Sequence, residues 1–280
     1  MNILKTVAAV LGLACALPSL AADEPGGWAL SLGPGSALEA ARRLFSGATQ
    51  EADGSLVLAH DRQLRLPGTS KTRAQLPAGT RLSAPTALHV RSEGRPYTLL
   101  MWEGVRPDAS GDGGFGEEVA VLAVLPEGSL DASDVAEVKG DRDTYLDQGP
   151  VLGSEDAFTV LNAHHNSSQG YASTDLFHLR DGRLRRIASV FTLSSLINCQ
   201  DAFQEDLQWR VEPDGDGPPR ILAKLTLTHA PALMRSGCDR MPRTRNEHFE
   251  DRYRWNAAQK RYLHEGGNSD RLDRWNDQHR

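Results

Sequence analysis

The chain has 280 residues, of which 39% are hydrophobic and 24% charged, and its formal net charge is −6. This composition is typical of one or two folded domains and excludes a largely disordered chain. Nucleic-acid binding needs a surplus of Lys and Arg to neutralise phosphates, so the acidic balance argues against a nucleic-acid partner.

The N-terminal segment has the three parts of a secretory signal peptide. Lys5 supplies the positive charge, residues 6–17 are almost wholly apolar, and Ser-Leu-Ala at 19–21 places small residues where a signal peptidase cuts. We expect residues 1–21 to be removed and the mature protein to be periplasmic or secreted. No later segment reaches the ~20 apolar residues of a transmembrane helix, so none is expected in the mature chain.

The cysteines fit the same compartment. Cys15 lies inside the leader after Gly-Leu-Ala, and lipidation at Cys15 is therefore an alternative route of processing. After cleavage only Cys199 and Cys238 remain, and two thiols in an oxidising compartment most simply form one disulfide. Closing this loop of about 40 residues would stabilise the fold by roughly 3–4 kcal/mol through loop-closure entropy.

The first predicted element of the mature chain is a short helix over 37–46. Ser36 and Glu39 have the spacing of a capping box, in which each side chain accepts a hydrogen bond from the backbone N–H of the other residue. Leu38, Ala41 and Phe45 follow close to helical spacing.

From residue 55 onward the pattern predicts short strands joined by turns. Val119 to Leu125 is continuously apolar, which predicts a central strand buried on both faces. The polar stretch 131–145 is expected to be a long connection or to carry one helical turn. The other strands predicted in this half are bounded by Gly, Pro or charged pairs and cover 55–59, 63–66, 81–90 and 97–105. Glu93-Gly94 is the predicted turn between the last two of these strands.

The second half contains a predicted three-stranded antiparallel meander over 157–192. Asp181-Gly182 marks a tight hairpin in this meander, because both residues tolerate positive φ. The tail 266–280 has little apolar content and is expected to be loose. The predicted strands are 157–165, 171–180 and 183–192, followed by two hairpins that join 208–212 to 221–229 and 252–255 to 260–264.

These elements predict an all-β fold of mainly antiparallel sheets, sandwich-like or propeller-like, with one short N-terminal helix. We expect residues 22–265 to form a single β-rich domain. A boundary between two lobes near 145–156 is the alternative within this domain.

The candidate binding residues surround the loop of the meander. Residues 164–168, His-His-Asn-Ser-Ser, carry the side chains of nucleophilic catalysis, but neighbouring strand residues point to opposite faces and no G-x-S-x-G motif is present. We therefore assign no catalytic residue. A binding role is predicted for His165, Asn166, Gln169 and Tyr171.

One loop has the opening of a calcium site. Asp108, Ser110 and Asp112 occupy its first, third and fifth positions, and a glycine follows at the sixth. The twelfth position is Val119, where an EF-hand has a bidentate glutamate. Calcium is thus the one cofactor that the sequence raises, and no other cofactor is expected.

Two classes of function remain open. The favoured one is an exported, non-catalytic binding or accessory protein with a protein, peptide or glycan partner in the cell envelope, including an inhibitor or immunity role. The alternative is an envelope-directed hydrolase that uses His164 or His165 with a Ser or Asp partner. A histidine, a carboxylate and a hydroxyl in mutual contact would favour the enzyme, and exposed aromatic rings on an open sheet would favour binding.

Overall fold

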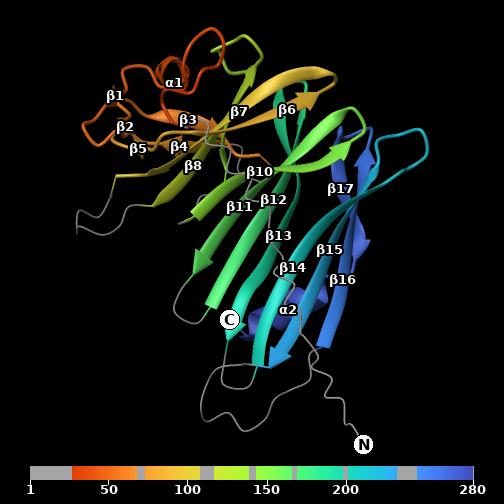
Figure 1. Ribbon diagram of the computed structural model, residues 1–280. Coiled ribbons are helices and arrows are strands. Elements are labelled where there is room, and N and C mark those ends of the chain that lie inside the picture. The colour runs from red at the N-terminus through yellow and green to blue at the C-terminus, as the bar shows by residue number, and fades with distance from the viewer. Residues whose placement is uncertain are drawn as a thin grey trace, which may run out of the picture.

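The described part of the protein consists of two β-sheets and two helices (Figure 1). The structure is a computed structural model, which describes residues 27–67, 73–107, 117–138, 143–165, 169–197, 201–231 and 245–279. The predicted all-β fold of mainly antiparallel sheets with a short N-terminal helix is confirmed. The residues of several predictions lie outside the described ranges: the leader 1–21, Cys199 and Cys238, and Asp108, Ser110 and Asp112.

Helix α1 (Ala37–Leu44) begins at the predicted capping box. The Ser36 hydroxyl accepts a hydrogen bond from the N–H of Glu39 at 3.3 Å, and the Glu39 carboxylate accepts one from the N–H of Ser36 at 2.7 Å. The buried face consists of three alanines and Leu44, and it packs against the first sheet. Small side chains on this face let the helix lie close to the strands.

The first sheet occupies the N-terminal half. Its strand order is β1-β2-β5-β7-β8-β9-β3-β4, and β6 pairs with β7 beside this path. The strands are β1 (Thr49–Gln50), β2 (Leu56–Val57), β3 (Arg62–Arg65), β4 (Arg73–Leu76), β5 (Arg81–Leu82), β6 (Thr86–Ser92), β7 (Arg95–Val105), β8 (Glu118–Pro126) and β9 (Asp134–Val138).

Strand β8 is the buried centre of this sheet, as its apolar run predicts. All residues from Val119 to Leu125 are at most 2% exposed. Side chains alternate along a strand, so Val121 and Ala123 join the core under α1, while Leu122 and Val124 join the core shared with the second sheet.

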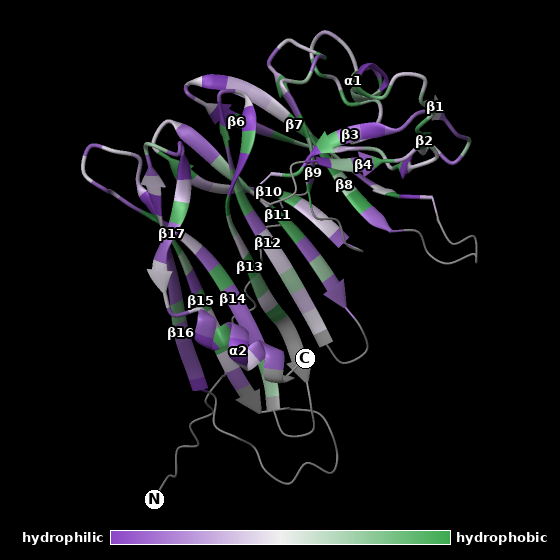
Figure 2. Ribbon diagram, turned by 180° about the vertical axis from the view of Figure 1, so that it is seen from behind, coloured by the Kyte–Doolittle hydropathy of each residue, from purple (hydrophilic) through white to green (hydrophobic). Residues whose placement is uncertain are grey.

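The second sheet contains eight strands that are antiparallel in chain order. The predicted meander is confirmed, and Asp181 and Gly182 have the positive φ angles, 52° and 66°, of the predicted hairpin. Apolar and polar residues alternate along these long strands (Figure 2). The strands are β10 (Asp143–Leu152), β11 (Glu155–His165), β12 (Gln169–Arg180), β13 (Arg183–Ile197), β14 (Asp201–Glu212), β15 (Arg220–Pro231), β16 (Arg245–Asn256) and β17 (Arg261–Gly267).

Helix α1 packs on the first sheet, the other face of the first sheet meets the second sheet, and helix α2 (Asp270–His279) packs on the second sheet. The two sheets share one buried cluster, in which Met101 and Leu122 of the first sheet meet Phe158 and Phe177 of the second. The rings of Phe158 and Phe177 are stacked at 5.5 Å between centroids.

An ion pair also joins the sheets. Arg65 of β3 binds both carboxylate oxygens of Asp134 in β9, and the contact of Nε with Oδ1 is 3.0 Å. The same carboxylate accepts the N–H of Leu184 in β13 at 2.8 Å, and Arg65 donates to the carbonyl of Leu184 at 2.8 Å. The backbone of the second sheet is therefore bound by a charged pair from the first.

The expectation of a loose tail is wrong for the residues of α2. Leu272 is 1% exposed and Asn276 is fully buried, and Trp275 packs on Phe203 with 4.8 Å between ring centroids. These three positions lie three and four residues apart, so one helical turn brings them to the same face. Leu272 and Trp275 are enough to anchor the helix because both pack against a face of the second sheet. Neither helix of the described chain has the length and apolar content needed to cross a bilayer.

Two strand predictions in the first half also need correction. The stretch 131–145 is neither a helical turn nor a plain connection, because 134–138 form β9 and pair with β8. The predicted strand 81–90 is split into β5 and β6, and Pro85 lies at the break, where it has no N–H to donate to a ladder. The chain changes sheets between Val138 and Asp143, shortly before the predicted boundary at 145–156.

Candidate functional site

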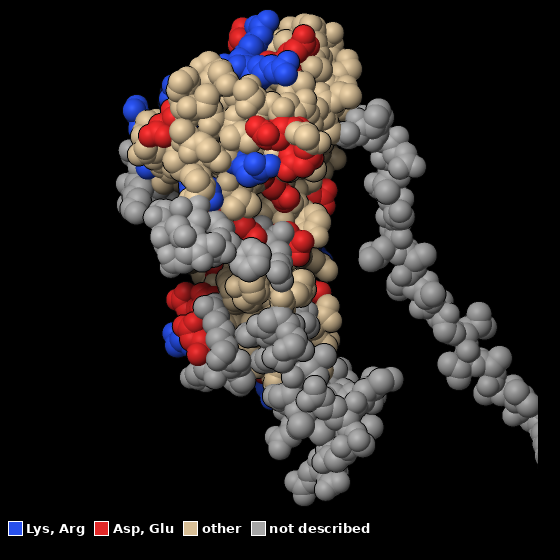
Figure 3. Space-filling view, turned by 90° about the vertical axis from the view of Figure 1, so that its left-hand side faces the viewer, with Lys and Arg blue, Asp and Glu red and all other residues tan. Residues whose placement is uncertain are grey.

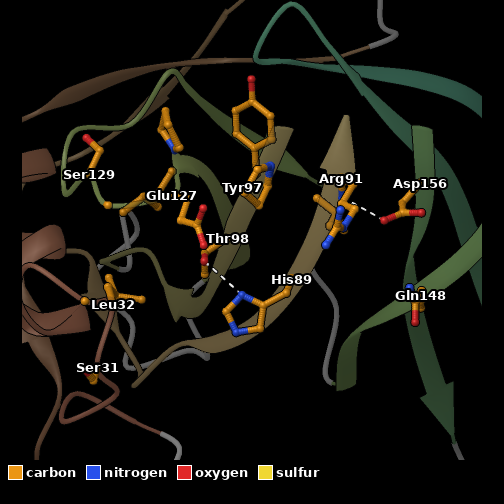
Figure 4. Close-up of a pocket in the computed structure, with 16 residues that line it drawn as sticks. Ser31, Leu32, His89, Arg91, Tyr97, Thr98, Glu127, Ser129, Gln148 and Asp156 are labelled. Atoms are coloured by element: carbon orange, nitrogen blue, oxygen red, sulfur yellow. Dashed lines mark hydrogen bonds between the residues drawn. The ribbon is translucent and has the colours of Figure 1, made fainter. Parts of the chain in front are cut away.

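A hollow of about 620 Å³ lies where the two sheets meet (Figure 4). Strands β6 and β7 supply His89, Arg91 and Thr98, while Gln148 and Asp156 come from β10 and β11 of the second sheet. The N-terminal loop around Leu32 and the β8–β9 turn around Glu127 form the remaining wall. Ligand sites are frequent at such junctions between substructures.

The hollow follows an edge of β6. Among the described strands, β6 pairs with β7 alone. Its other edge faces the second sheet, where the Asp156 carboxylate accepts the main-chain N–H of Arg91 at 2.7 Å (Figure 4). Main-chain groups of alternate residues point to the same edge of a strand, so the N–H and C=O of His89 also point away from β7.

The side chains on the open face of the β6–β7 hairpin are polar. His89 Nδ1 lies 3.1 Å from the hydroxyl of Thr98, directly across the ladder (Figure 4). The neighbouring Val90 and Tyr97 pack into the core shared by the sheets. The hairpin therefore has an anchored apolar face and an open polar face.

The charges around this hollow are mixed in sign. Arg91 and Glu127 are exposed, and Asp156 is half-buried. On the face shown in Figure 3, Lys and Arg are likewise interspersed with Asp and Glu. No group of three or more potential metal ligands comes together among the described residues. The site is thus suited to directional hydrogen bonding rather than to capture of a highly charged ligand.

Two of the binding residues predicted from the sequence, His165 and Tyr171, lie on opposite faces of the second sheet. Tyr171 pairs with His164, and their rings stack at 4.8 Å between centroids. On its other side Tyr171 stacks with Phe191 at 5.6 Å. His165 is exposed and, as the next residue on β11, lies on the opposite face. Hence Tyr171 is accompanied by His164, and not by His165.

The rest of the predicted site is only partly described. Asn166 lies outside the described residues, as do the calcium candidates, and for Gln169 the backbone alone is described, in β12. The binding role of these residues and the calcium loop stay predictions. The aromatic ladder of His164, Tyr171 and Phe191 is half-buried, which leaves part of each ring at the surface.

Two histidines contact carboxylates within the described ranges. His178 Nδ1 lies 3.3 Å from Glu155, and His264 Nε2 lies 3.6 Å from Asp251. Sequence reasoning gave neither pair, because the partners are distant along the chain. The described contacts place no carboxylate against His165. The hydroxyls of Ser167 and Ser168 lie outside the described residues, so the hydrolase that uses His164 or His165 stays an alternative prediction.

Sequence reasoning also missed the junction hollow. The Glu93-Gly94 turn signal correctly predicts that β6 and β7 pair, with φ angles of 51° and 76° at the turn. It carries no information about Asp156, which reaches Arg91 from 65 residues away.

Comparisons with known proteins give no further information on the site. No family model matches the chain, and searches of curated proteins and of solved structures return no significant match.

Proposed function

We propose that the chain is an exported, non-catalytic binding protein that takes an extended peptide segment of an envelope partner along the open edge of β6. The observation that carries this proposal is the direction of the main-chain groups at His89 and Arg91. Arg91 already binds an acceptor from the second sheet, and His89 offers the same kind of donor to the hollow.

An extended peptide matches this edge in two respects. Outward main-chain groups recur every second residue, about 6.6 Å apart, which is also the repeat of a bound strand. Strand addition of this kind draws its affinity from main-chain bonds and its specificity from alternate side chains. The exposed side chains of Arg91, Glu127 and Gln148 stand where they can contact those of the peptide.

Export and a disulfide belong to the same proposal. The leader at 1–21 supports export to the periplasm or the medium. The disulfide is proposed on the sequence alone, because Cys199 and Cys238 are the two cysteines left after the leader is removed, and both lie outside the described residues. Intact-mass analysis of the exported protein should find residues 1–21 absent and no free thiol.

A peptide probe tests the binding proposal. A binder is selected from a displayed library of random nonapeptides, and its affinity for the mature protein is measured by fluorescence anisotropy. Each backbone nitrogen of the peptide is then methylated in turn. We expect weakening by about fivefold or more at alternate positions only, because the loss of one main-chain hydrogen bond costs about 1 kcal/mol.

Two substitutions at one position provide the matched control. His89→Ala keeps the outward N–H and should change affinity by less than about threefold, whereas His89→Pro removes the donor and should weaken binding by about fivefold or more. Proline is tolerated at a strand edge, and thermal melting confirms that the variant folds. Equal affinity of the two variants, or N-methylation effects without alternation, would show that the β6 edge is not the site.

A further inference from the structure

A second hollow, separate from the β6 edge, lies around Trp255. It has a volume of about 320 Å³ and is lined by the β10–β11 turn, by Arg180 of β12, and by Trp255 and Tyr262 of the last hairpin. A neighbouring hollow of about 640 Å³ contains Arg254 and Asn256. The two hollows share Trp255 and the Gly217-Pro218 loop, so Trp255 contributes to both.

The indole of Trp255 is held in place by its neighbours. The guanidinium of Arg180 lies 4.4 Å from the ring centroid, and the rings of Tyr262 and His178 approach edge-on at 5.4 and 5.9 Å. Tyr262 is fixed in turn, because its hydroxyl donates to the carbonyl of Pro219 at 3.1 Å. Burial raises the pKa of Tyr262 above its usual value, which keeps this donor protonated. A rigid aromatic platform loses little entropy when a ligand binds.

Four charged side chains around the indole are already paired: Glu155, Arg180, Asp214 and Arg254. Glu155 lies 3.3 Å from His178 and 3.9 Å from Arg180. Arg254 donates to both oxygens of Asp214, at 2.7 and 3.3 Å. Both hollows therefore present carboxylate and guanidinium groups with fixed positions and without a large excess of either sign.

These pairings narrow the class of ligand. A cation would meet Arg180, which occupies the cation–π position on the indole, and an anion would meet the carboxylates of Glu155, Asp214 and Asp216. A wholly apolar ligand would take these charged pairs out of water and offer them no new hydrogen bond. A neutral ring with several hydroxyls avoids all three penalties, since its C–H face packs on the indole and its hydroxyls donate and accept.

We infer that the two hollows around Trp255 bind a neutral oligosaccharide, with one sugar ring against the indole. Each hollow falls in the range of about 300–1,000 Å³ that is usual for ligand sites. Their common wall at Trp255 places two neighbouring subsites along one chain of sugars. This binding is additional to the peptide segment at β6 and uses different residues.

The test uses indole N–H signals of the mature protein. Five tryptophans give five such signals in a ¹H–¹⁵N spectrum, and Trp255→Phe identifies the one from Trp255. The probes are neutral trisaccharides of β-1,4-linked glucose, β-1,4-linked N-acetylglucosamine, β-1,4-linked mannose and α-1,4-linked glucose, with glycerol as a control. We expect at least one trisaccharide, and not glycerol, to shift the Trp255 signal in a saturable manner.

Variants then assign the binding energy. Trp255→Phe keeps an aromatic ring and should weaken the trisaccharide by about threefold, whereas Trp255→Ala should weaken it by about tenfold or more. Arg261→Ala is the matched control, because this exposed neighbour of Tyr262 lies on the opposite face of β17 and should leave affinity unchanged. His89→Pro should also leave it unchanged, which separates this test from that of the β6 edge.

Three outcomes would overturn the inference. The first is that no trisaccharide shifts the Trp255 signal at its highest soluble concentration. The second is that a sugar binds and moves the signal of another tryptophan instead. The third is that the Trp255 signal responds to the selected peptide and to no sugar, which would assign these hollows to peptide binding.

Discussion

The Asp156 carboxylate, at the start of β11, accepts the main-chain N–H of Arg91 in β6 at 2.7 Å. A side chain of the second sheet thus occupies a hydrogen-bonding position that a neighbouring strand would otherwise fill. The bond fixes one end of the β6 edge and leaves the position of His89, two residues earlier, open to the hollow.

Replacement of Asp156 tests this bond. Asp156→Ala should lower the free energy of unfolding by about 1–2 kcal/mol, because the Arg91 N–H loses its acceptor. Asp156→Asn retains a side-chain oxygen and should cost less. Amide hydrogen exchange at Arg91, followed by NMR, should accelerate in the alanine variant. Unchanged exchange at this amide would contradict the bond.

The ion pair between Arg65 and Asp134 is expected to be important for the junction of the sheets. Asp134→Ala should destabilise the protein by about 2–4 kcal/mol, since it removes the anion that pairs with Arg65 and leaves the N–H of Leu184 without its acceptor. Urea unfolding measures the change. The exposed pair of Arg43 and Asp131 is the control, and Asp131→Ala should change stability by less than about 1 kcal/mol. Equal effects of the two substitutions would refute the structural role of Asp134.

Helix α2 should contribute to global stability. Leu272→Ala removes a side chain that is 1% exposed and should cost about 2–4 kcal/mol in urea unfolding. Arg274→Ala, on the exposed side of the same helix, should stay within about 0.5 kcal/mol of the wild type. A neutral effect of Leu272→Ala would restore the view of a loose tail.

Stability should fall at alkaline pH through Tyr253. Burial, together with the charges of Asp251 and Asp273, raises the pKa of Tyr253 from 10.0 to about 12. The folded protein keeps the phenol proton over this range and the unfolded chain loses it, so the favourable contribution is complete below pH 10 and is lost as pH rises towards 12.

A rise in the pKa of Tyr253 from 10.0 to about 12 corresponds to about 2–3 kcal/mol of folding free energy. Urea unfolding of the wild type and of Tyr253→Phe, measured at several pH values from 9 to 12, isolates it. The variant should lose less stability over this interval. Parallel curves for the two proteins would mean that Tyr253 titrates normally in the folded state.

Local patterns predicted much of the fold because the forces behind them act over a few residues. The capping box at Ser36 and the hairpin at Asp181-Gly182 depend on neighbouring backbone groups, and both are confirmed. The apolar run of β8 is explained by burial on both faces. By contrast, α2 has only Leu272 and Trp275 as apolar anchors, and its stability depends on a sheet face formed far away along the chain.

The candidate sites were less predictable for the same reason. The sequence singled out His165 and Tyr171, but strand pairing brings His164 to Tyr171. Arg180 and Trp255 come together only because the second sheet folds around, and no local signal links residues so far apart. The order of strands in a meander does not by itself predict which residues face each other, because that also depends on the register of each strand pair.

The β10–β11 hairpin forms a common wall of both proposed sites, since Asp156 lines the hollow beside β6 and the preceding Glu155 lines the hollow at Trp255. A ligand that restrains this hairpin at one site would also reduce the conformational freedom of the hairpin at the other site. Thermodynamic linkage makes any such cooperativity reciprocal: the factor by which a sugar changes the affinity for a peptide equals the factor by which the peptide changes the affinity for the sugar. The protein would then respond to the proposed peptide and sugar together rather than to each in isolation.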